Sequence, residues 1–277
     1  MAGAVASVAL AAEARAGTPY VGIEGGALIG RDNDIDVVVD YTTSQTPAAP
    51  SAPAGPADVE FDDVFNLKYK TGYDVDAVAG YDFGFFRLEL ELGYKRAGFE
   101  GIEPDETLDS LTSSLNTALN RPSAAPDPGV PGLPALTAGD FDVDGKIGVL
   151  SAMANGMVEL EVIDRLSIFA GGGYGRAQAK ALGDKDSAWA WQYMIGFRYA
   201  ISPKVELGLK HRYFNSGIVK LRDRNGVAHV GNANRIDVTP PGGPTTTVNQ
   251  ATDARLFPEL EGEFRTRSFL VSLFYNF

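Results

Sequence analysis

The sequence has no cysteine and only two histidines, His211 and His229, among its 277 residues. The missing cysteines exclude a disulfide framework and any cysteine-ligated metal site. Two histidines leave almost no material for histidine-based chemistry. Basic residues are also in the minority, since 24 Lys and Arg stand against 36 Asp and Glu for a formal net charge of −12. Because binding to nucleic acid needs clustered cationic side chains, nucleic acid is not an expected partner.

Long apolar runs are absent as well. No stretch approaches the roughly 20 apolar residues that a transmembrane helix needs. A membrane protein without such helices has to be a closed β-barrel, because the bilayer core offers no hydrogen-bond partners for unpaired backbone groups. Residues 47–56 and 122–134 are rich in proline, a composition that favours exposed loops over a packed core.

The first 16 residues have the character of the end of a secretory signal. Residues 2–12 are small and apolar, and Ala14-Arg15-Ala16 offers an A-x-A cleavage site before Gly17. The usual basic segment is missing, so a disordered alanine-rich terminus is the alternative interpretation. We expect an exported protein in which residues 1–16 are the remnant of a signal and residues 17–277 form a single domain.

The last ten residues carry the pattern on which the fold prediction depends. Phe269, Val271, Leu273, Tyr275 and Phe277 share one face at a period of two, and the chain ends on an aromatic residue. A soluble strand can alternate in the same way. An unbroken terminal strand with aromatic residues near its end and no charge on its apolar face is typical of an outer-membrane barrel.

Seven further segments alternate at the same period. The clearest is residues 86–95, FRLELELGYK, where large apolar residues alternate with charged residues and one glycine. A tight turn at residues 82–84 joins this segment to the strand before it. The predicted strands are 19–30, 72–82, 85–96, 141–161, 166–175, 189–199, 205–213 and 268–277. In the strand 141–161, where the alternation is least regular, Val143, Ile147, Val149 and Met153 are expected to face outward.

The connections between these strands differ in length according to the side of the barrel. Short turns join strands two and three, four and five, and six and seven, whereas the long connections 31–70, 98–140 and 216–264 all fall on the opposite side. Short periplasmic turns and long external loops are expected of an outer-membrane barrel. Residues 106–119 place four leucines on one side and predict a short helix within the second connection.

The alternation divides the strand residues into two sets. Charged residues are predicted to face the lumen, where an eight-stranded barrel is just wide enough for side chains to fill and opposite charges have to pair. We predict an ion-paired plug, and a narrow ion path gated by rearranging those pairs is the alternative. The predicted lumen residues are Glu24, Asp74, Asp76, Arg87, Glu89, Glu91, Lys95, Asp142, Asp144, Lys146, Arg198, Glu206, Lys210 and Arg212. The predicted lipid-facing aromatic girdle is Tyr73, Tyr81, Phe86, Tyr94, Trp189, Trp191, Tyr193, Phe197, Tyr199, Tyr213, Phe269, Tyr275 and Phe277.

Several of these segments resemble a known family. Residues 73–84 (YDVDAVAGYDFG), 86–94 (FRLELELGY) and 20–26 (YVGIEGG), with the segments 191–199 and 207–214 and the final Phe277, are similar to the opacity-type, OmpA-like small barrels of Gram-negative bacteria. The resemblance implies an all-β, eight-stranded, antiparallel, up-and-down transmembrane barrel with long extracellular loops.

The resemblance is specific for the barrel superfamily and does not specify an activity. We expect a non-enzymatic protein with a structural, surface-display or adhesion role, and a narrow porin-like channel is the alternative. The expected partners are outer-membrane lipids, lipopolysaccharide and, through the C-terminal strand, the barrel-assembly machinery. The sequence does not identify a ligand of the loops. His211 departs from the family, which more often has a lipid-facing aromatic residue there. The peptidoglycan-binding domain of larger OmpA relatives has no counterpart before Phe277, so a role in cell-wall anchoring is not expected.

Two further motifs are weak. Asp140, Asp142 and Asp144 followed by Gly145 match the first half of a calcium loop, but Ser151 stands where the bidentate Glu belongs. His211 and Ser216 bear a loose likeness to the residues of barrel enzymes that deacylate lipid A, a reaction that needs the two side chains within hydrogen-bond reach. We therefore predict no catalytic residue, no metal and no cofactor.

Overall fold

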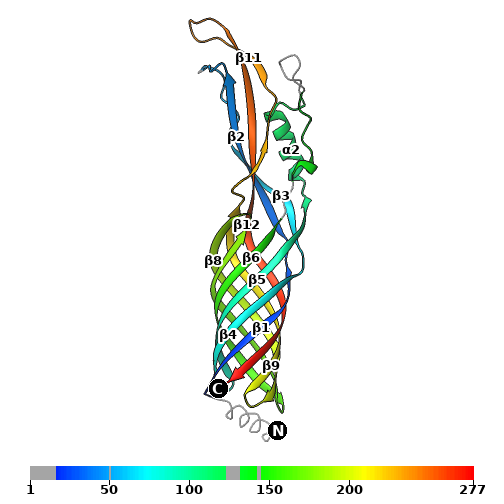
Figure 1. The fold of residues 1–277 in the computed structure, drawn as a ribbon, viewed down its shortest axis with the longest axis vertical. Coiled ribbons are helices and arrows are strands. Elements are labelled where there is room, and N and C mark those ends of the chain that lie inside the picture. Colours follow the sequence, from blue (N-terminus) through cyan, green and yellow to red (C-terminus); the bar gives the residue numbers. More distant parts are fainter. Residues whose placement is uncertain (1–16, 50, 123–131, 142–144) are drawn as a thin grey trace.

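The computed structural model describes residues 17–49, 51–122, 132–141 and 145–277 (Figure 1). The possible signal at residues 1–16 lies outside the described residues. The helices are α2 (Thr107–Ala118) and the short 3-10 helix η1 (Ala138–Asp140). The strands are β1 (Thr18–Gly30), β2 (Asn33–Thr46), β3 (Val59–Tyr69), β4 (Gly72–Asp82), β5 (Phe86–Pro104), β6 (Lys146–Ile163), β7 (Leu166–Ala181), β8 (Asp184–Ser202), β9 (Val205–Arg222), β10 (Val227–His229), β11 (Asn234–Val238) and β12 (Thr246–Asn276).

Eight of these strands form a closed antiparallel ring. Their order is β1-β4-β5-β6-β7-β8-β9-β12, and β12 pairs back to β1 from Tyr20↔Asn276 to Gly30↔Thr266. Closure gives both edge strands a hydrogen-bond partner, which a bilayer requires of every spanning strand. The predicted eight-stranded up-and-down barrel is confirmed.

The turns at the two ends of the ring differ in length. At the end that holds the C-terminus, residues 83–85, 164–165 and 203–204 join neighbouring strands (Figure 1). At the other end only the β7–β8 connection is short. It consists of Leu182 and Gly183, which have φ values of 52° and 79°. Positive φ at both central residues matches the twist of a two-residue hairpin.

The first long connection continues the barrel wall beyond β1 and β4. β2 and β3 pair with each other, β2 pairs with β12, and β3 pairs with the end of β5. Residues 31–70 were predicted to be a polar connection in which residues 35–41 could extend the first strand. Strand structure at 35–41 is confirmed by β2, and the remainder of the connection contains more strand than predicted. The alternating Ile35, Val37 and Val39 are buried there and supply the apolar face of a strand.

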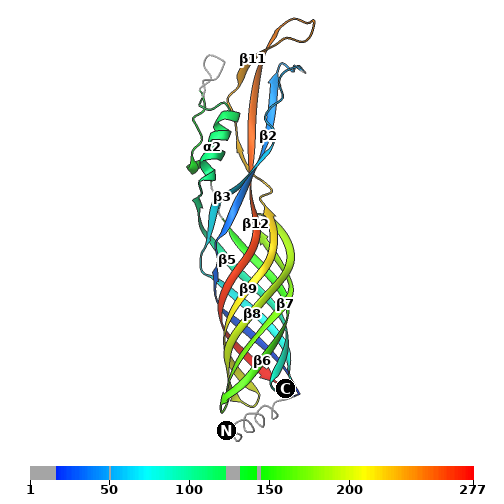
Figure 2. The same cartoon turned by 180° about the vertical axis from the view of Figure 1, so that it is seen from behind.

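The last long connection is also more ordered than predicted. β9 runs on to Arg222, β10 and β11 pair with β12, and β12 itself begins at Thr246. β12 contains 31 residues, whereas a strand needs only about 9–11 residues to cross a bilayer. β12 is therefore much longer than a crossing needs, and it runs from the barrel far into the upper part of the molecule (Figure 2).

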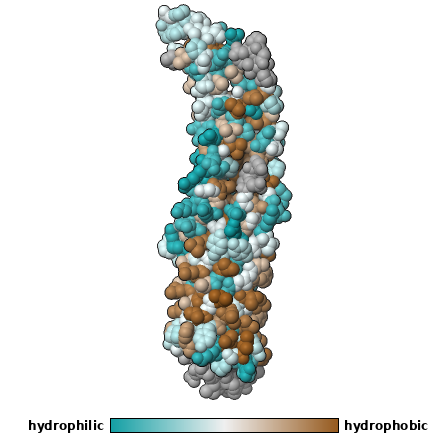
Figure 3. Space-filling view, viewed as in Figure 1, coloured by the Kyte–Doolittle hydropathy of each residue, from teal (hydrophilic) through white to brown (hydrophobic). Residues whose placement is uncertain are grey.

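The apolar side of the wall changes along each strand. On the lower part of β5, Leu90 is 68% exposed on the outside and Glu91 is 1% exposed on the inside. Beyond Tyr94 the order reverses, with Arg96 on the outside and Phe99 on the inside. We call this boundary the crossover. On β12 it falls between Phe269 and Arg267, and Figure 3 shows the hydrophobic band below a more hydrophilic upper part.

Beyond the crossover the interior resembles that of a water-soluble protein. We call this part, built around β2, β3, α2, β10, β11 and the outer half of β12, the upper lobe. Helix α2 presents Leu108, Leu111 and Leu115 to its apolar core, as the leucine spacing predicted. Among the described residues no helix is long and apolar enough to cross a membrane.

The crossover also corrects the predicted faces of strand 141–161. Ile147, Val149 and Met153 were predicted to face outward, but they are buried, and Leu150 is exposed instead. Ile147 and Val149 lie in the upper lobe, where apolar residues point inward. Lys146 was predicted to face the lumen and is exposed on the outer wall.

The leucine face of α2 provides a test of whether the upper lobe has an apolar core of its own. Leu115→Ala should destabilise the upper lobe by about 2–5 kcal/mol, because it leaves a cavity in a packed core. Added protease should then cut the folded protein faster near α2, while the heat-modifiable gel migration of the barrel is kept. Ser114→Ala, at the exposed neighbouring position, is the control. Equal protection of both variants would contradict a core role for Leu115.

Candidate functional site

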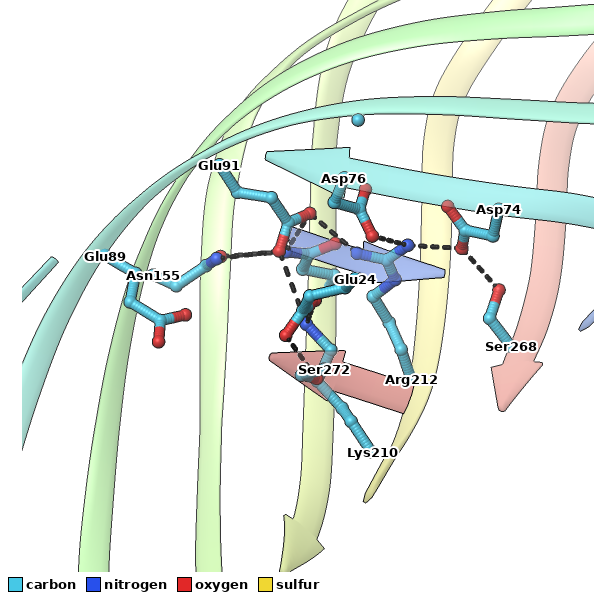
Figure 4. Close-up of polar contacts among 12 residues, drawn as sticks. Glu24, Asp74, Asp76, Glu89, Glu91, Asn155, Lys210, Arg212, Ser268 and Ser272 are labelled. Carbon is cyan, nitrogen blue, oxygen red and sulfur yellow. Dashed lines mark hydrogen bonds and ion pairs between the residues drawn. The ribbon is translucent and has the colours of Figure 1, made fainter. Parts of the chain in front are cut away.

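The charged side chains below the crossover form a connected set inside the barrel, which we call the lumen network. Arg212 of β9 lies at its upper end, is 0% exposed, and contacts three carboxylates (Figure 4). Its guanidinium donates hydrogen bonds to Asp74 and, at 2.7 Å, to Glu91, and it forms an ion pair with Asp76 at 2.9 Å. Such charge-assisted contacts fix the donor and its acceptors in one arrangement.

Two lysines complete this upper group. Lys95 lies 3.6 Å from Asp74 and 3.7 Å from Asp76. Lys210 pairs with Glu24 and lies 3.6 Å from Glu91.

Uncharged side chains also donate hydrogen bonds to the carboxylates of the upper group. Ser268 donates to Asp74 at 2.6 Å, and Ser272 donates to Glu24 at 2.8 Å (Figure 4). Asn155 and Gln192 each donate to Glu91 at 3.2 Å. The upper group therefore joins residues from seven of the eight barrel strands.

Two arginines hold the lower group together. Arg87 lies 2.8 Å from Asp82, 2.9 Å from Glu159 and 3.2 Å from Glu206. Arg198 bridges Glu89 at 2.7 Å and Glu159 at 3.2 Å. Aromatic rings cover Arg198, whose guanidinium carbon lies 4.6 Å from the ring centroid of Phe274 and 4.7 Å from that of Phe169. These contacts fill the width of the lumen with side chains.

The structure brings together most of the residues predicted for the lumen. Eleven of them are buried inside the barrel: Glu24, Asp74, Asp76, Arg87, Glu89, Glu91, Lys95, Arg198, Glu206, Lys210 and Arg212. Lys146 is the exception noted above, and Asp142 and Asp144 lie outside the described residues. The prediction missed Asp82 and Glu159, which continue the inward-facing period of β4 and β6 close to the lower turns.

The network holds more acids than bases. With Asp82 and Glu159 included, eight buried carboxyl groups face five cations among the described lumen residues. The sequence suggested a closer balance, because Lys146 was counted inside. The lumen is therefore an acidic environment.

Glycines on the inner wall provide the space that the network occupies. A Cβ added at Gly93 would lie 2.3 Å from Oδ1 of Asp76 and 2.9 Å from Nζ of Lys95. A Cβ at Gly22 would lie 2.2 Å from the ring of Phe274. Both distances are shorter than real Cβ contacts, so a larger residue at either position would displace these side chains in a barrel this narrow.

The residues predicted for the aromatic girdle all lie on the outer wall, from partly to largely exposed. Trp189 is 57% exposed and Phe277 is 66% exposed. Tyr193 and Tyr213 stack across β8 and β9 with centroids 4.9 Å apart. The thirteen side chains are Tyr73, Tyr81, Phe86, Tyr94, Trp189, Trp191, Tyr193, Phe197, Tyr199, Tyr213, Phe269, Tyr275 and Phe277.

The weaker motifs do not form sites in the described residues. Ser216 accepts a hydrogen bond from the backbone N–H of Phe264 and donates to the carbonyl of Gly217, while His211 packs against Phe269 on the outer wall. His229 lies in the upper lobe, where burial lowers its pKa. Among the described residues no group of three or more His, Cys, Asp or Glu side chains is placed to hold a metal ion.

A closed ring with an ionic interior and an apolar outer wall defines an outer-membrane barrel. Residues 2–239 match the family model described as "Outer membrane protein beta-barrel domain", and the chain belongs to this family. The protein is therefore located in the outer membrane of a Gram-negative bacterium. Curated proteins give no match.

Solved structures of small outer-membrane barrels are similar to this chain at low identity. Neisserial surface protein A is 11% identical, with a TM-score of 0.39 over 94% of this chain and 97% of that one. The outer membrane protein OprG from Pseudomonas aeruginosa is 9% identical, with a TM-score of 0.45 over 95% and 97%. The attachment invasion locus protein Ail of Yersinia pestis is 11% identical, with a TM-score of 0.27 over 90% and 99%.

Arg212 tests the energetic role of the lumen network. Arg212→Met leaves buried carboxylates without their main cation, so the free energy of unfolding should fall by about 3–5 kcal/mol. Urea unfolding of the protein in lipid vesicles, followed by tryptophan fluorescence, measures the change. Arg222→Met is the control, because Arg222 is partly exposed on the same strand and lies 3.5 Å from Asp40. That variant should lose less than about 1 kcal/mol, and equal losses would contradict the expectation.

Proposed function

We propose that this protein is a closed, non-conducting barrel that anchors the upper lobe and presents it at the cell surface. The observation that carries the proposal is the lumen network, which crosses the barrel with buried ion pairs between strands on opposite walls. Water and ions would have to break several of these pairs to pass. Because breaking one buried pair costs about 3–5 kcal/mol, spontaneous opening is rare.

The outer wall supports the same placement in the membrane. The large exposed apolar residues below the crossover would aggregate in water, whereas in a bilayer they face hydrocarbon. The aromatic girdle then lies against outer-membrane lipid and lipopolysaccharide. The terminal strand, which ends at Phe277, is the segment that the barrel-assembly machinery engages.

The upper lobe supports a display role. Its strands continue well beyond the length that a bilayer requires, and a separate apolar core with α2 gives it internal rigidity. A loop that merely closed the barrel would need neither feature. The lobe thus holds its outermost turns, such as residues 240–243 between β11 and β12, far from the membrane (Figure 1).

Planar-bilayer recording separates an anchor from a channel. The purified protein should insert stably and give no reproducible current steps. If it conducts instead, the acidic excess in the lumen predicts selectivity for cations over anions. Discrete cation-selective steps from the unmodified protein would overturn the proposal and favour a narrow channel.

Epitope insertion tests which end of the molecule faces the medium. A short tag between Gly242 and Gly243 should be stained by antibody on intact cells, because this turn is exposed in the upper lobe. The same tag between Phe83 and Gly84, in a turn at the opposite end, should be stained only after the outer membrane is permeabilised. The reverse pattern would contradict the proposed orientation.

A further inference from the structure

Two cavities lie one above the other on the outer wall of strands β5, β6 and β7, and the lower one extends onto β4. The upper cavity has a volume of about 700 Å³ and lies at the crossover. The lower cavity has a volume of about 600 Å³ and lies within the hydrophobic band. Neither belongs to the lumen network, and both open to the surroundings of the barrel.

Cations line the upper cavity. Arg96 of β5, Lys146 of β6 and Lys180 of β7 contribute three positive charges, against which Asp223 contributes one negative charge among the described lining residues. No carboxylate within the described part of the chain forms an ion pair with any of these three cations, although the chain as a whole has a net charge of −12. Within those residues, the three cations are available to an anion from outside.

The strand register explains why these cations surround a hollow. Arg96 pairs with Gly148, and Gly148 pairs with Lys180, so a glycine separates the two cationic side chains. With strands spaced about 4.8 Å apart, the two cations leave the wall about 10 Å from each other. Lys146 lies one step further along β6, where it pairs with Gly98. The ring of Tyr94 lies over Gly148, with its Oη 3.0 Å from the position of an added Cβ, and the side chain of Lys70 lies 3.8 Å from the same position at Gly98. These two side chains therefore border the opening.

The lower cavity is apolar and continues from the upper one along the same strands. The outward side chains that line it include Leu90 and Leu92 of β5 and Ala152 and Ala154 of β6. The alanine side chains are shorter than the leucine side chains beside them, so the surface over the alanines is a shallow groove. Its β7 side is bounded by Tyr174, which stacks on Trp189 at 5.3 Å, and by the cation Arg176, whose guanidinium carbon lies 5.1 Å from the ring centroid of Trp189.

The strand register places the two cavities on one strip of the outer wall. From the row of Arg96, Gly148 and Lys180, the outward face of the three strands steps by two residues at a time down to the row of Leu90, Ala154 and Tyr174. Six residues of strand span about 20 Å. The surface therefore joins a cationic opening at the membrane boundary to an apolar groove that extends into the hydrocarbon.

We propose that this surface binds one phosphorylated, acylated glycolipid of the outer leaflet, of the lipid A type, with a phosphate between Arg96, Lys146 and Lys180 and an acyl chain over Ala152 and Ala154. The proposal rests on the orientation given under Proposed function, because the cationic end has to face the outer leaflet. Charge complementarity selects an anionic headgroup, and the groove selects an attached chain. A soluble anion has no acyl chain and would leave the groove unoccupied.

Binding of purified bisphosphorylated lipid A to the full-length protein in detergent, measured by native mass spectrometry, tests the proposal. Replacing Arg96, Lys146 and Lys180 together by Gln should weaken binding by about tenfold or more, because charge-assisted contacts are lost. The control triple variant replaces Arg31, Arg265 and Arg267 by Gln, which removes the same number of cations near the crossover on another part of the wall. Equal weakening by both triple variants would overturn the site in favour of diffuse attraction.

The groove is tested with the variant Ala152→Phe plus Ala154→Phe, which fills it with outward-facing apolar groups. This variant should also weaken lipid A binding, while dephosphorylated lipid A should bind poorly to the unmodified protein. Equal binding of phosphatidylglycerol, or unchanged binding to the groove variant, would contradict a glycolipid site. Every variant is checked for heat-modifiable migration and for silence in planar bilayers, so a failed lipid site is distinguished from a failed anchor.

Discussion

Hydrogen bonding between β1 and β12 is the constraint on which the rest of the structure depends. A barrel strand in a bilayer has no water to satisfy its backbone, so the sheet has to close on itself. Closure with eight strands leaves a lumen only wide enough for side chains. Once hydrocarbon covers the outer wall, the inner wall is the one place where the charged residues of the alternating pattern can lie. The lumen network and the inner glycines are consequences of that closure.

The crossover shows how one strand serves two solvents. On β5, the residues on either side of Tyr94 keep the period of two, yet the apolar set moves from the outer wall to the inner wall. Below this point the outside is hydrocarbon, and above it the outside is water, so apolar residues turn inward as in soluble sheets. The upper lobe can therefore hold an apolar core built by α2 and Phe214, although its strands are continuous with a membrane-spanning barrel.

This change of side explains what the sequence could and could not reveal. Alternation identified the eight barrel strands and most of the lumen charges, because a charged residue between leucines has only one favourable side in lipid. Alternation shows which residues share a face of a strand, but it does not show whether that face meets hydrocarbon or water. The faces of Ile147 and Val149 and the position of Lys146 were therefore assigned wrongly. The sequence also could not show which charged residues pair with one another. Arg212 contacts Asp74 across 138 positions of sequence, and only the shear of the closed barrel brings them together.

The distribution of charge gives the two walls different roles. Inside, acids outnumber bases, but each lumen cation contacts at least two carboxylates, so the positive charges there are already engaged. Outside, Arg96 and Lys180 stand at the crossover across a glycine. Cations that are ion-paired stabilise the barrel, whereas cations without such partners attract ligands of opposite charge. In the proposed orientation the crossover lies at the outer leaflet, and the outer wall would then be where this acidic protein makes favourable electrostatic contact with anionic headgroups.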